Sequence, residues 1–195
     1  MYIVLTEDQN DFEAIKIILK RLENDQHLQV KGRGFSGSGQ LFNLGAITFN
    51  SIIKATNARN PKCVVVHDCD KDESEHKHQR VAKDILTKIK TEAILCSIIP
   101  KQEIEAWILA DIASVTKVFN GWIPKKSYPQ PENIDDPKEE LKKQSRTQNL
   151  KPRYTESDAA KLAAVLDLET VRRKCPSFQI LHNLVKTQQG NHPPK

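Results

Sequence analysis

Three consecutive valines, Val64–Val66, predict a strand buried on both faces, because β-branched side chains suit a pleated sheet and the run has no polar side. Short apolar runs also stand at residues 2–5, 28–31 and 93–100. A segment whose apolar residues recur at helical spacing follows each of these four runs. Strands that alternate with helices in this way predict an α/β fold, with a mostly parallel sheet flanked by helices.

The sequence also divides the chain into two parts. Residues 1–120 contain all four expected strands, whereas the chain beyond Gly121 begins with a long proline-containing loop. We therefore expect a core over residues 1–120 and a basic loop and helical extension over residues 121–195 that packs on it. The expected helices of the core cover residues 11–22, 41–57, 73–90 and 102–111.

Helix-start signals place three helices in the extension. Asp136 can cap a short helix that begins at Pro137, and Thr155 with Asp158 can cap a helix over residues 155–175. Ser177 can cap a last helix, over residues 177–186, and we expect the tail after it to fray.

Composition is typical of a soluble globular protein, with 38% apolar and 28% charged residues among 195. No apolar stretch reaches the roughly 20 residues that span a bilayer, and the acidic turn after the first strand does not resemble a secretory signal. The four scattered cysteines indicate reduced thiols, so we expect a cytoplasmic protein. Residues 1–120 hold 16 basic and 16 acidic residues, and the rest hold 14 and 9, so the net charge of +5 lies in the extension.

Carboxylates follow three of the expected strands, at the position where functional groups gather in parallel sheets. Glu7 follows the first strand, Asp68, Asp70 and Asp72 follow the valine run, and Glu103 and Glu105 follow residues 93–100. Asp68 and Asp70 are two apart, so in an extended segment they project to the same side and can share one Mg²⁺. The alternative, that acids such as Asp72 only cap the next helix, stays open.

Several basic residues are candidates for contact with nucleic acid. Lys31 and Arg33 belong to a glycine-rich loop whose amides could hold a phosphate. Lys151, Arg153 and Tyr154 form a basic-aromatic patch suited to a nucleic-acid backbone. A flexible connection and a solvated loop explain these segments equally well. Lys101, just before the acidic helix, could stabilise charge that develops on a phosphate.

The acids and their spacing resemble the Toprim domain, which topoisomerases, bacterial primases, recombination factors and OLD-family nucleases share. Its first motif, EGxTD or EGxSD after strand one, is matched by "TEDQND", with Glu7 as the glutamate and Asp11 as the later acid. Its second motif is matched by "VVVHDCD", with Asp68 and Asp70. Asp8 stands where the family has glycine, and Asp tolerates the left-handed backbone that glycine permits.

A finer likeness covers "IPKQEIEAWILAD", which is similar to a group of small bacterial Toprim-like proteins with a Glu-Ile-Glu-Ala-Trp motif. The resemblance implies that Glu7 and Asp11 are catalytic acids and that Glu103 and Glu105, with Asp111 as a further candidate, are linked to the metal. Because Glu103 and Glu105 are two apart, they cannot both face the site if the helix has already begun, and Glu103 is then the better placed.

Two functions follow from this likeness. The first is a nuclease that depends on Mg²⁺ or Mn²⁺ and acts in bacterial phage defence beside an ATPase partner, since this chain has no Walker motif. The second is a non-catalytic Toprim-like subunit that regulates an ATPase complex or binds nucleic acid for it. Both are compatible with a homo-oligomer, and neither involves a membrane.

Overall fold

The computed structural model describes residues 1–69, 74–146 and 151–193. At its centre is an all-parallel sheet in the strand order β2-β1-β3-β4. The strands are β1 (Tyr2–Thr6), β2 (Val30–Gly34), β3 (Lys62–Val66) and β4 (Ile94–Ile98). The expected α/β fold with a parallel sheet is therefore confirmed.

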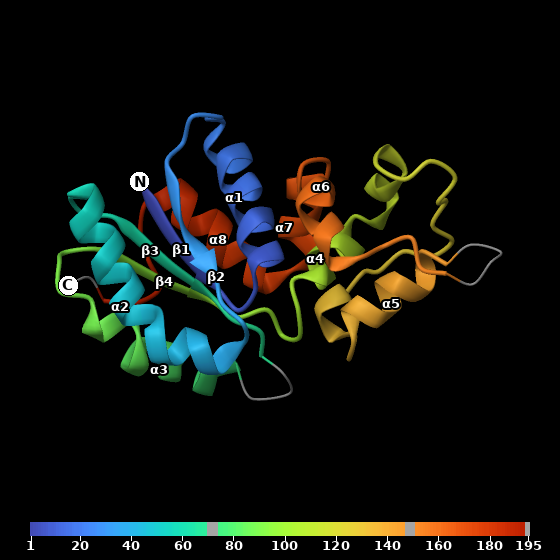
Figure 1. Cartoon of the computed structure of the whole chain (residues 1–195). Helices are drawn as coiled ribbons and strands as arrows, with labels where there is room; N and C mark the ends of the chain where they lie inside the picture. Colours follow the sequence, from blue (N-terminus) through green and yellow to red (C-terminus); the bar gives the residue numbers. More distant parts are fainter. Residues whose placement is uncertain (70–73, 147–150, 194–195) are drawn as a thin grey trace.

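Side-chain alternation along the strands divides the hydrophobic core into two clusters, one on each face of the sheet. Every residue of β1 is buried, with Tyr2 and Val4 in one cluster and Ile3 and Leu5 in the other. Figure 1 shows the helices that cover the two faces. These are α1 (Gln9–Glu23) and α8 (Pro176–Thr187) on the first face, and α2 (Ser38–Thr56) and α3 (Ser74–Asp84) on the second.

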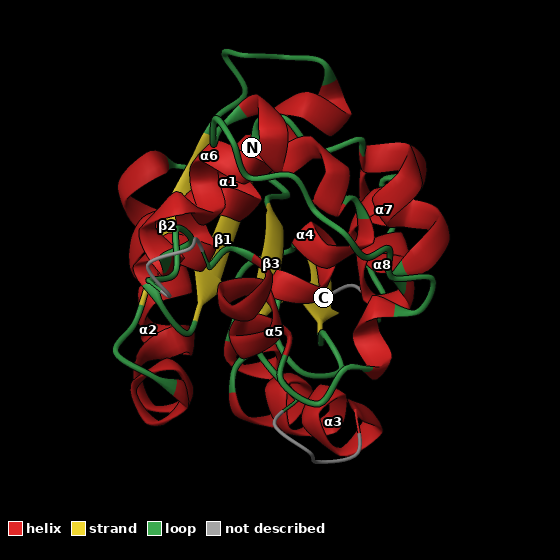
Figure 2. Cartoon of the chain, turned by 90° about the vertical axis from the view of Figure 1, so that its right-hand side faces the viewer, coloured by secondary structure: helices red, strands yellow, loops and turns green. Residues whose placement is uncertain are grey.

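The remaining helices follow β4 in the chain and are α4 (Glu105–Ala110), α5 (Pro137–Gln144), α6 (Ala159–Ala163) and α7 (Leu168–Lys174). α4 and α5 lie beyond the carboxyl ends of the strands, whereas α6 packs against α1 and α7 packs against α8 (Figures 1 and 2). Short 3₁₀ turns occupy Leu86–Lys88 (η1), Ile112–Lys117 (η2), Pro131–Asn133 (η3) and Glu156–Asp158 (η4). None of the helices in the described ranges has the length and apolar character needed to cross a bilayer.

The extension contributes directly to the core. Phe178 and Leu181 of α8 lie in the same hydrophobic cluster as Tyr2 and Val4 of β1. The guanidinium of Arg21, in α1, donates at 2.6 Å to each of the Ala163 and Leu166 carbonyls at the end of α6. These charge-assisted bonds satisfy carbonyls that have no partner within the helix.

Most predicted helix starts are confirmed. Asp136 accepts a hydrogen bond from the Glu139 amide with Pro137 in the first turn of α5, and Thr155 and Asp158 form a capping box. The start predicted at Ser177 is wrong, because α8 begins at Pro176 after an N-cap at Cys175.

Two predicted helices are shorter than expected. The helix expected over residues 73–90 ends at Asp84 and gives way to η1. The helix expected over residues 155–175 is divided into α6 and α7, because Asp167 accepts hydrogen bonds from the Glu169 and Thr170 amides and starts a new helix.

The first part of the segment predicted to be a glycine-rich loop is a strand, and a shorter connection at residues 35–37 leads to α2. β2 extends to Gly34, so Lys31 and Arg33 lie in the edge strand of the sheet. At Gly34 the backbone passes so close to α1 that a Cβ would lie 2.0 Å from the Asp8 carbonyl oxygen. Only glycine fits there. The Gly34 amide donates a hydrogen bond to Oε1 of Gln9 at 3.0 Å, which fixes the turn between β1 and α1.

The described part of the C-terminal tail, residues 188–193, lies against the open edge of β4, which corrects the expectation of fraying for these residues. The side-chain amide of Asn191 bonds both the amide and the carbonyl of Ser97, at 2.9 and 2.8 Å. The Ser97 hydroxyl lies 2.5 Å from Nδ1 of His78, in α3, and 2.6 Å from Nε2 of His192. The tail is thus connected through β4 to α3.

We expect acid to loosen this tail. Burial lowers the pKa of both His78 and His192 below the ordinary 6.5, although Glu75 nearby favours their charged forms. Unfolding therefore takes up protons, so stability from this contact is fully present above pH 6.5 and falls as the pH drops below it. The hydrogen-exchange protection factor of the Ser97 amide should fall over this range.

The variant His192→Gln should reduce that pH dependence, whereas His27→Gln, at an exposed histidine on the loop after α1, should leave it as in the wild type. A protection factor for Ser97 that stays constant below pH 6.5 in the wild type would contradict the prediction.

Candidate functional site

Carboxylates from three separate stretches of the chain meet at the carboxyl edge of the sheet. β1, β3 and β4 are adjacent and parallel, so the residues that follow them lie side by side. The charges of four acids act on Asp68, so each of the four lies near Asp68. We call this group the acidic cluster; it consists of Glu7, Asp11, Asp68, Glu103 and Glu105.

Glu7 connects the ends of β1 and β3. Its Oε1 accepts hydrogen bonds from the Asp68 amide at 3.0 Å and from Nδ1 of His67 at 2.9 Å. Although burial raises the pKa of Glu7, these two bonds outweigh that effect and lower it below its ordinary value. Glu7 is therefore held in its ionised form.

His67 is buried on the face of the sheet opposite to Asp68, as side-chain alternation requires, and its ring packs 5.0 Å from that of Phe42. Its Nδ1, which bonds to Glu7, also lies 2.5 Å from the carbonyl oxygen of Asp68. Within the described ranges, Nε2 of His67 has no hydrogen-bond partner.

Burial and the charges of neighbouring acids disfavour the ionised forms of Asp11 and Asp68. Burial, followed by the charges of Asp11, Glu7, Glu105 and Glu103, raises the pKa of Asp68 well above its ordinary value. Burial and the charge of Asp8 do the same for Asp11 in the first turn of α1. A positive charge at this place would relieve the repulsion.

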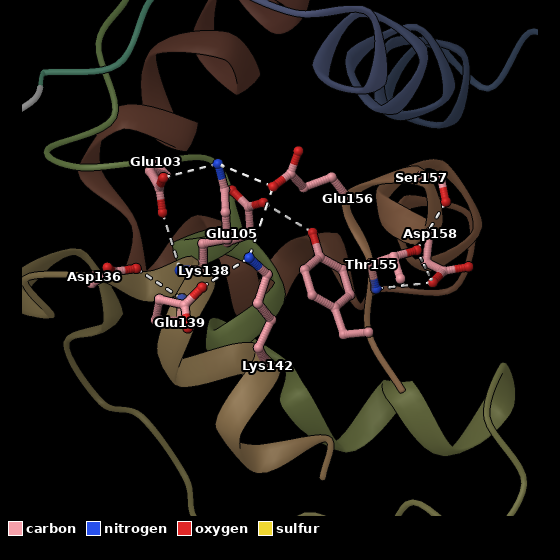
Figure 3. Close-up of polar contacts among 11 residues, drawn as sticks. Glu103, Glu105, Asp136, Lys138, Glu139, Lys142, Thr155, Glu156, Ser157 and Asp158 are labelled. Atoms are coloured by element: carbon pink, nitrogen blue, oxygen red, sulfur yellow. Dashed lines mark hydrogen bonds and ion pairs between the residues drawn. The ribbon is translucent and has the colours of Figure 1, made fainter. Parts of the chain in front are cut away.

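The extension supplies one such charge through Lys138, in the first turn of α5. Its Nζ lies 3.0 Å from Oε1 of Glu103, and its backbone amide donates to Oε2 of the same glutamate at 3.1 Å (Figure 3). Glu156 lies 3.7 Å from the same ammonium. Glu103 is thus held at both of its oxygens by one lysine.

Glu105 is the most buried carboxylate of the pair that follows β4, at 4% exposed. Burial raises its pKa to about 7, and the charge of Lys138 only partly opposes this. The hydroxyl of Tyr154 donates to its Oε1 at 3.0 Å (Figure 3). Near neutral pH, Glu105 can therefore hold or release a proton.

The start of α4 decides how Glu103 and Glu105 share the cluster. The helix begins at Glu105, so Glu103 precedes it and is free of the helical spacing that was expected to separate the two side chains. The condition under which only Glu103 was expected to face the site is therefore not met, and the charges of both glutamates act on Asp68. Asp111 instead accepts hydrogen bonds from the Ser114 hydroxyl and the Asp167 amide.

The residue at the glycine position of the Toprim motif has a role of its own. Asp8 has an extended backbone, with φ −135°, so no left-handed conformation is needed. Its Oδ1 accepts hydrogen bonds from the Asn10 and Asp11 amides and caps α1.

The other predicted site residues that the structure describes lie outside the acidic cluster. Asp70 and Asp72 fall outside the described residues. Lys101 points to Asn133, whose Oδ1 accepts from its Nζ at 2.8 Å. Arg33 packs over the ring of Phe35, and Arg153 donates to the carbonyl of Asn120. Lys31 and Lys151 are exposed.

Sequence reasoning missed Lys138 and misplaced Tyr154. Asp136 and Pro137 already mark a helix start, which places Lys138 in its first turn, but no local signal directs that turn to Glu103. Tyr154 was expected in an exposed basic-aromatic patch, yet it is 1% exposed and bonded to Glu105.

The chemistry of the acidic cluster suits a hard divalent cation. Carboxylate oxygens are the ligands that Mg²⁺ prefers, and the raised pKa values of Asp11 and Asp68 show that negative charge there is not fully compensated. Among residues 1–69, 74–146 and 151–193, no three His, Cys, Asp or Glu side chains already have the spacing of a metal site. The donor set fits the ion, and binding it would require these side chains to rearrange.

The fold and the cluster define an α/β protein with an acidic centre at the carboxyl edge of a parallel sheet. Residues 6–186 match a family described as Domain of unknown function (DUF4276), and the chain belongs to that family. No curated protein and no solved structure matches it.

We expect Asp68→Asn to stabilise the metal-free protein at neutral pH. The substitution removes a charge that four acids oppose, and keeps the backbone amide that Glu7 accepts from. The free energy of unfolding in EDTA should be higher for this variant than for the wild type, because the substitution relieves repulsion by the neighbouring acids. Asp111→Asn should lower it, because Asp111 accepts hydrogen bonds and is not part of the cluster. Equal losses for the two variants in urea titrations would contradict the prediction.

Proposed function

We propose that the protein is a divalent-metal-dependent nuclease that cleaves phosphodiester bonds. One observation carries the proposal: acids from the ends of β1, β3 and β4 gather around Asp68 at the edge where parallel sheets place their functional groups. The resemblance of Glu7, Asp11 and Asp68 to Toprim motifs supports the same reading.

The chain's own residues have distinct parts in this proposal. Glu7, Asp11, Asp68 and Glu105 would hold Mg²⁺ or Mn²⁺, with Asp70 and Asp72 as further candidates from the sequence. The ion, when bound, would lower the pKa of a water molecule and neutralise charge on the phosphate. His67 keeps Glu7 ionised and oriented, and Tyr154 orients Glu105. Glu105, whose pKa burial raises to about 7 in the metal-free protein, would give up its proton when the ion binds.

The excess positive charge of the extension supports a polyanionic substrate. Residues 121–195 carry all of the net +5 charge, and electrostatic attraction would concentrate nucleic acid near the acidic cluster. The Toprim resemblance alone suggests a place in bacterial phage defence beside an ATPase. The chain itself has no Walker motif, so in such a system another protein would hydrolyse ATP.

A non-catalytic subunit is the second candidate. Lys138 already pairs with Glu103 and acts on Glu105, so part of the negative charge is neutralised without a metal. A centre of this kind could serve to hold α5 against the sheet while the protein binds nucleic acid or regulates an ATPase.

The test is a cleavage assay on single- and double-stranded DNA and RNA with Mg²⁺ or Mn²⁺. Relative to the wild type, Asp68→Asn and Glu7→Gln should each lose about 100-fold or more of the rate, as is usual when a group that acts on the reacting atoms is removed. Glu92→Gln is the matched control, since Glu92 is exposed before the amino end of β4 and should leave the rate unchanged.

Cleavage that survives Asp68→Asn would contradict the assignment of the site. A folded wild type that cleaves none of these substrates, with or without an ATPase partner, and that shows no uptake of either ion by calorimetry would favour the regulatory subunit.

A further inference from the structure

A cavity of about 790 Å³ lies beside the acidic cluster and has no role in the chemistry described above. Its walls come from the segment after β3, from α3, from the end of β4, from η3 and from the first turn of α8. Residues that are close together in the sequence belong to different sites. Asp68 belongs to the cluster and Cys69 to the cavity; Glu103 belongs to the cluster and Lys101 to the cavity.

Two lysines supply positive charge to the cavity. Lys101 is exposed and donates to Asn133 Oδ1 at 2.8 Å, and Lys174 donates to the Ala110 carbonyl at 2.6 Å. Both partners are neutral, and neither ammonium is ion-paired with a carboxylate of the described ranges. Glu75 and Glu132 also line the cavity, and the charge of Lys101 acts on Glu132, so an anion such as a phosphate is favoured only directly at the two ammonium groups.

Glu132 determines where such an anion can lie. This carboxylate is 7% exposed, and it accepts hydrogen bonds from the amide of Ser177, at 3.3 Å, and from its hydroxyl. It therefore already occupies the positive end of α8, and its own charge repels a second anion from that wall. An incoming phosphate is directed to the lysines instead.

The remaining walls are suited to a flat, largely apolar group. Ile99, Pro176 and Ile180 line the cavity with aliphatic carbon, and Ile99 is 4% exposed. A volume of 790 Å³ lies within the range of about 300–1,000 Å³ that small-molecule sites occupy. Cations beside an apolar wall match the two halves of a nucleotide, its phosphate and its base.

We propose that this cavity holds one nucleotide of the bound nucleic acid, with its phosphate at Lys101 and Lys174 and its base against Ile99 and Ile180. The inference rests on the proposed nuclease function and assigns to Lys101 a role in binding the substrate beside the acidic cluster. The cavity would then fix the strand so that an adjoining phosphodiester bond lies at the acids.

In the test, adenosine 5′-monophosphate is added up to millimolar concentration to the wild-type protein in EDTA. Binding is followed by NMR of the isoleucine methyl groups. EDTA keeps metal from carrying the nucleotide to the acidic cluster. The Ile180 methyl signals should shift on titration, and the double variant Lys101→Gln/Lys174→Gln should weaken binding about tenfold or more, the usual value of a lost charge-assisted hydrogen bond. Lys186→Gln, at an exposed lysine of α8, is the matched control.

Inorganic phosphate and adenosine, used as separate probes, test the phosphate-binding part and the base-binding part of the cavity one at a time. Inorganic phosphate should bind in a lysine-dependent manner, and adenosine should bind in a manner that depends on Ile180 and is lost in Ile180→Ser. Lys101→Gln alone changes an exposed side chain and should fold normally, so its effect on binding keeps the proposal testable if the double variant is unstable.

No shift at Ile180, or equal affinity in the wild type and both lysine variants, would overturn the inference while leaving the nuclease assay unaffected. Lysine-dependent binding of the nucleotide by a protein that cleaves no nucleic acid would instead keep the cavity as a nucleotide site and remove the proposed function.

Discussion

Repulsion among carboxylates at the carboxyl edge of the sheet is the interaction around which the rest of this protein is arranged. Asp68 faces four other acids in a setting where burial already disfavours charge. Rigid strands on both sides hold it there, because β1 and β3 are buried along almost their whole length. The sheet thus maintains an arrangement that isolated side chains would avoid.

The extension is part of this arrangement. Lys138 reaches Glu103 from α5, and Tyr154 reaches Glu105 from the segment before η4, so both glutamates depend on residues far away in the sequence. The same extension provides α8, whose apolar side chains complete one face of the core. The acidic centre and the hydrophobic core are therefore built from the same contacts between the two parts of the chain.

The sequence was sufficient to predict the sheet, because three valines in a row and helical spacing elsewhere are local signals. It also placed Glu7, Asp11, Asp68, Glu103 and Glu105 near one edge, since parallel strands end together. Lys138 could not be assigned in this way, because only tertiary packing brings it to Glu103. The tail was misjudged for a similar reason: Asn191 and His192 are stabilised by Ser97, which is distant in sequence.

The tail bears on self-association, because it covers the edge strand β4. An uncovered edge strand offers unpaired backbone groups to any neighbouring sheet. Asn191 occupies those of Ser97 with a side-chain amide, and Gly190 lets the backbone pass close to Leu95, where a Cβ would lie 1.9 Å from the carbonyl oxygen. A chain shortened before Gly190 would present a bare, apolar strand to solvent, and self-association through that strand would become the main hazard in handling it.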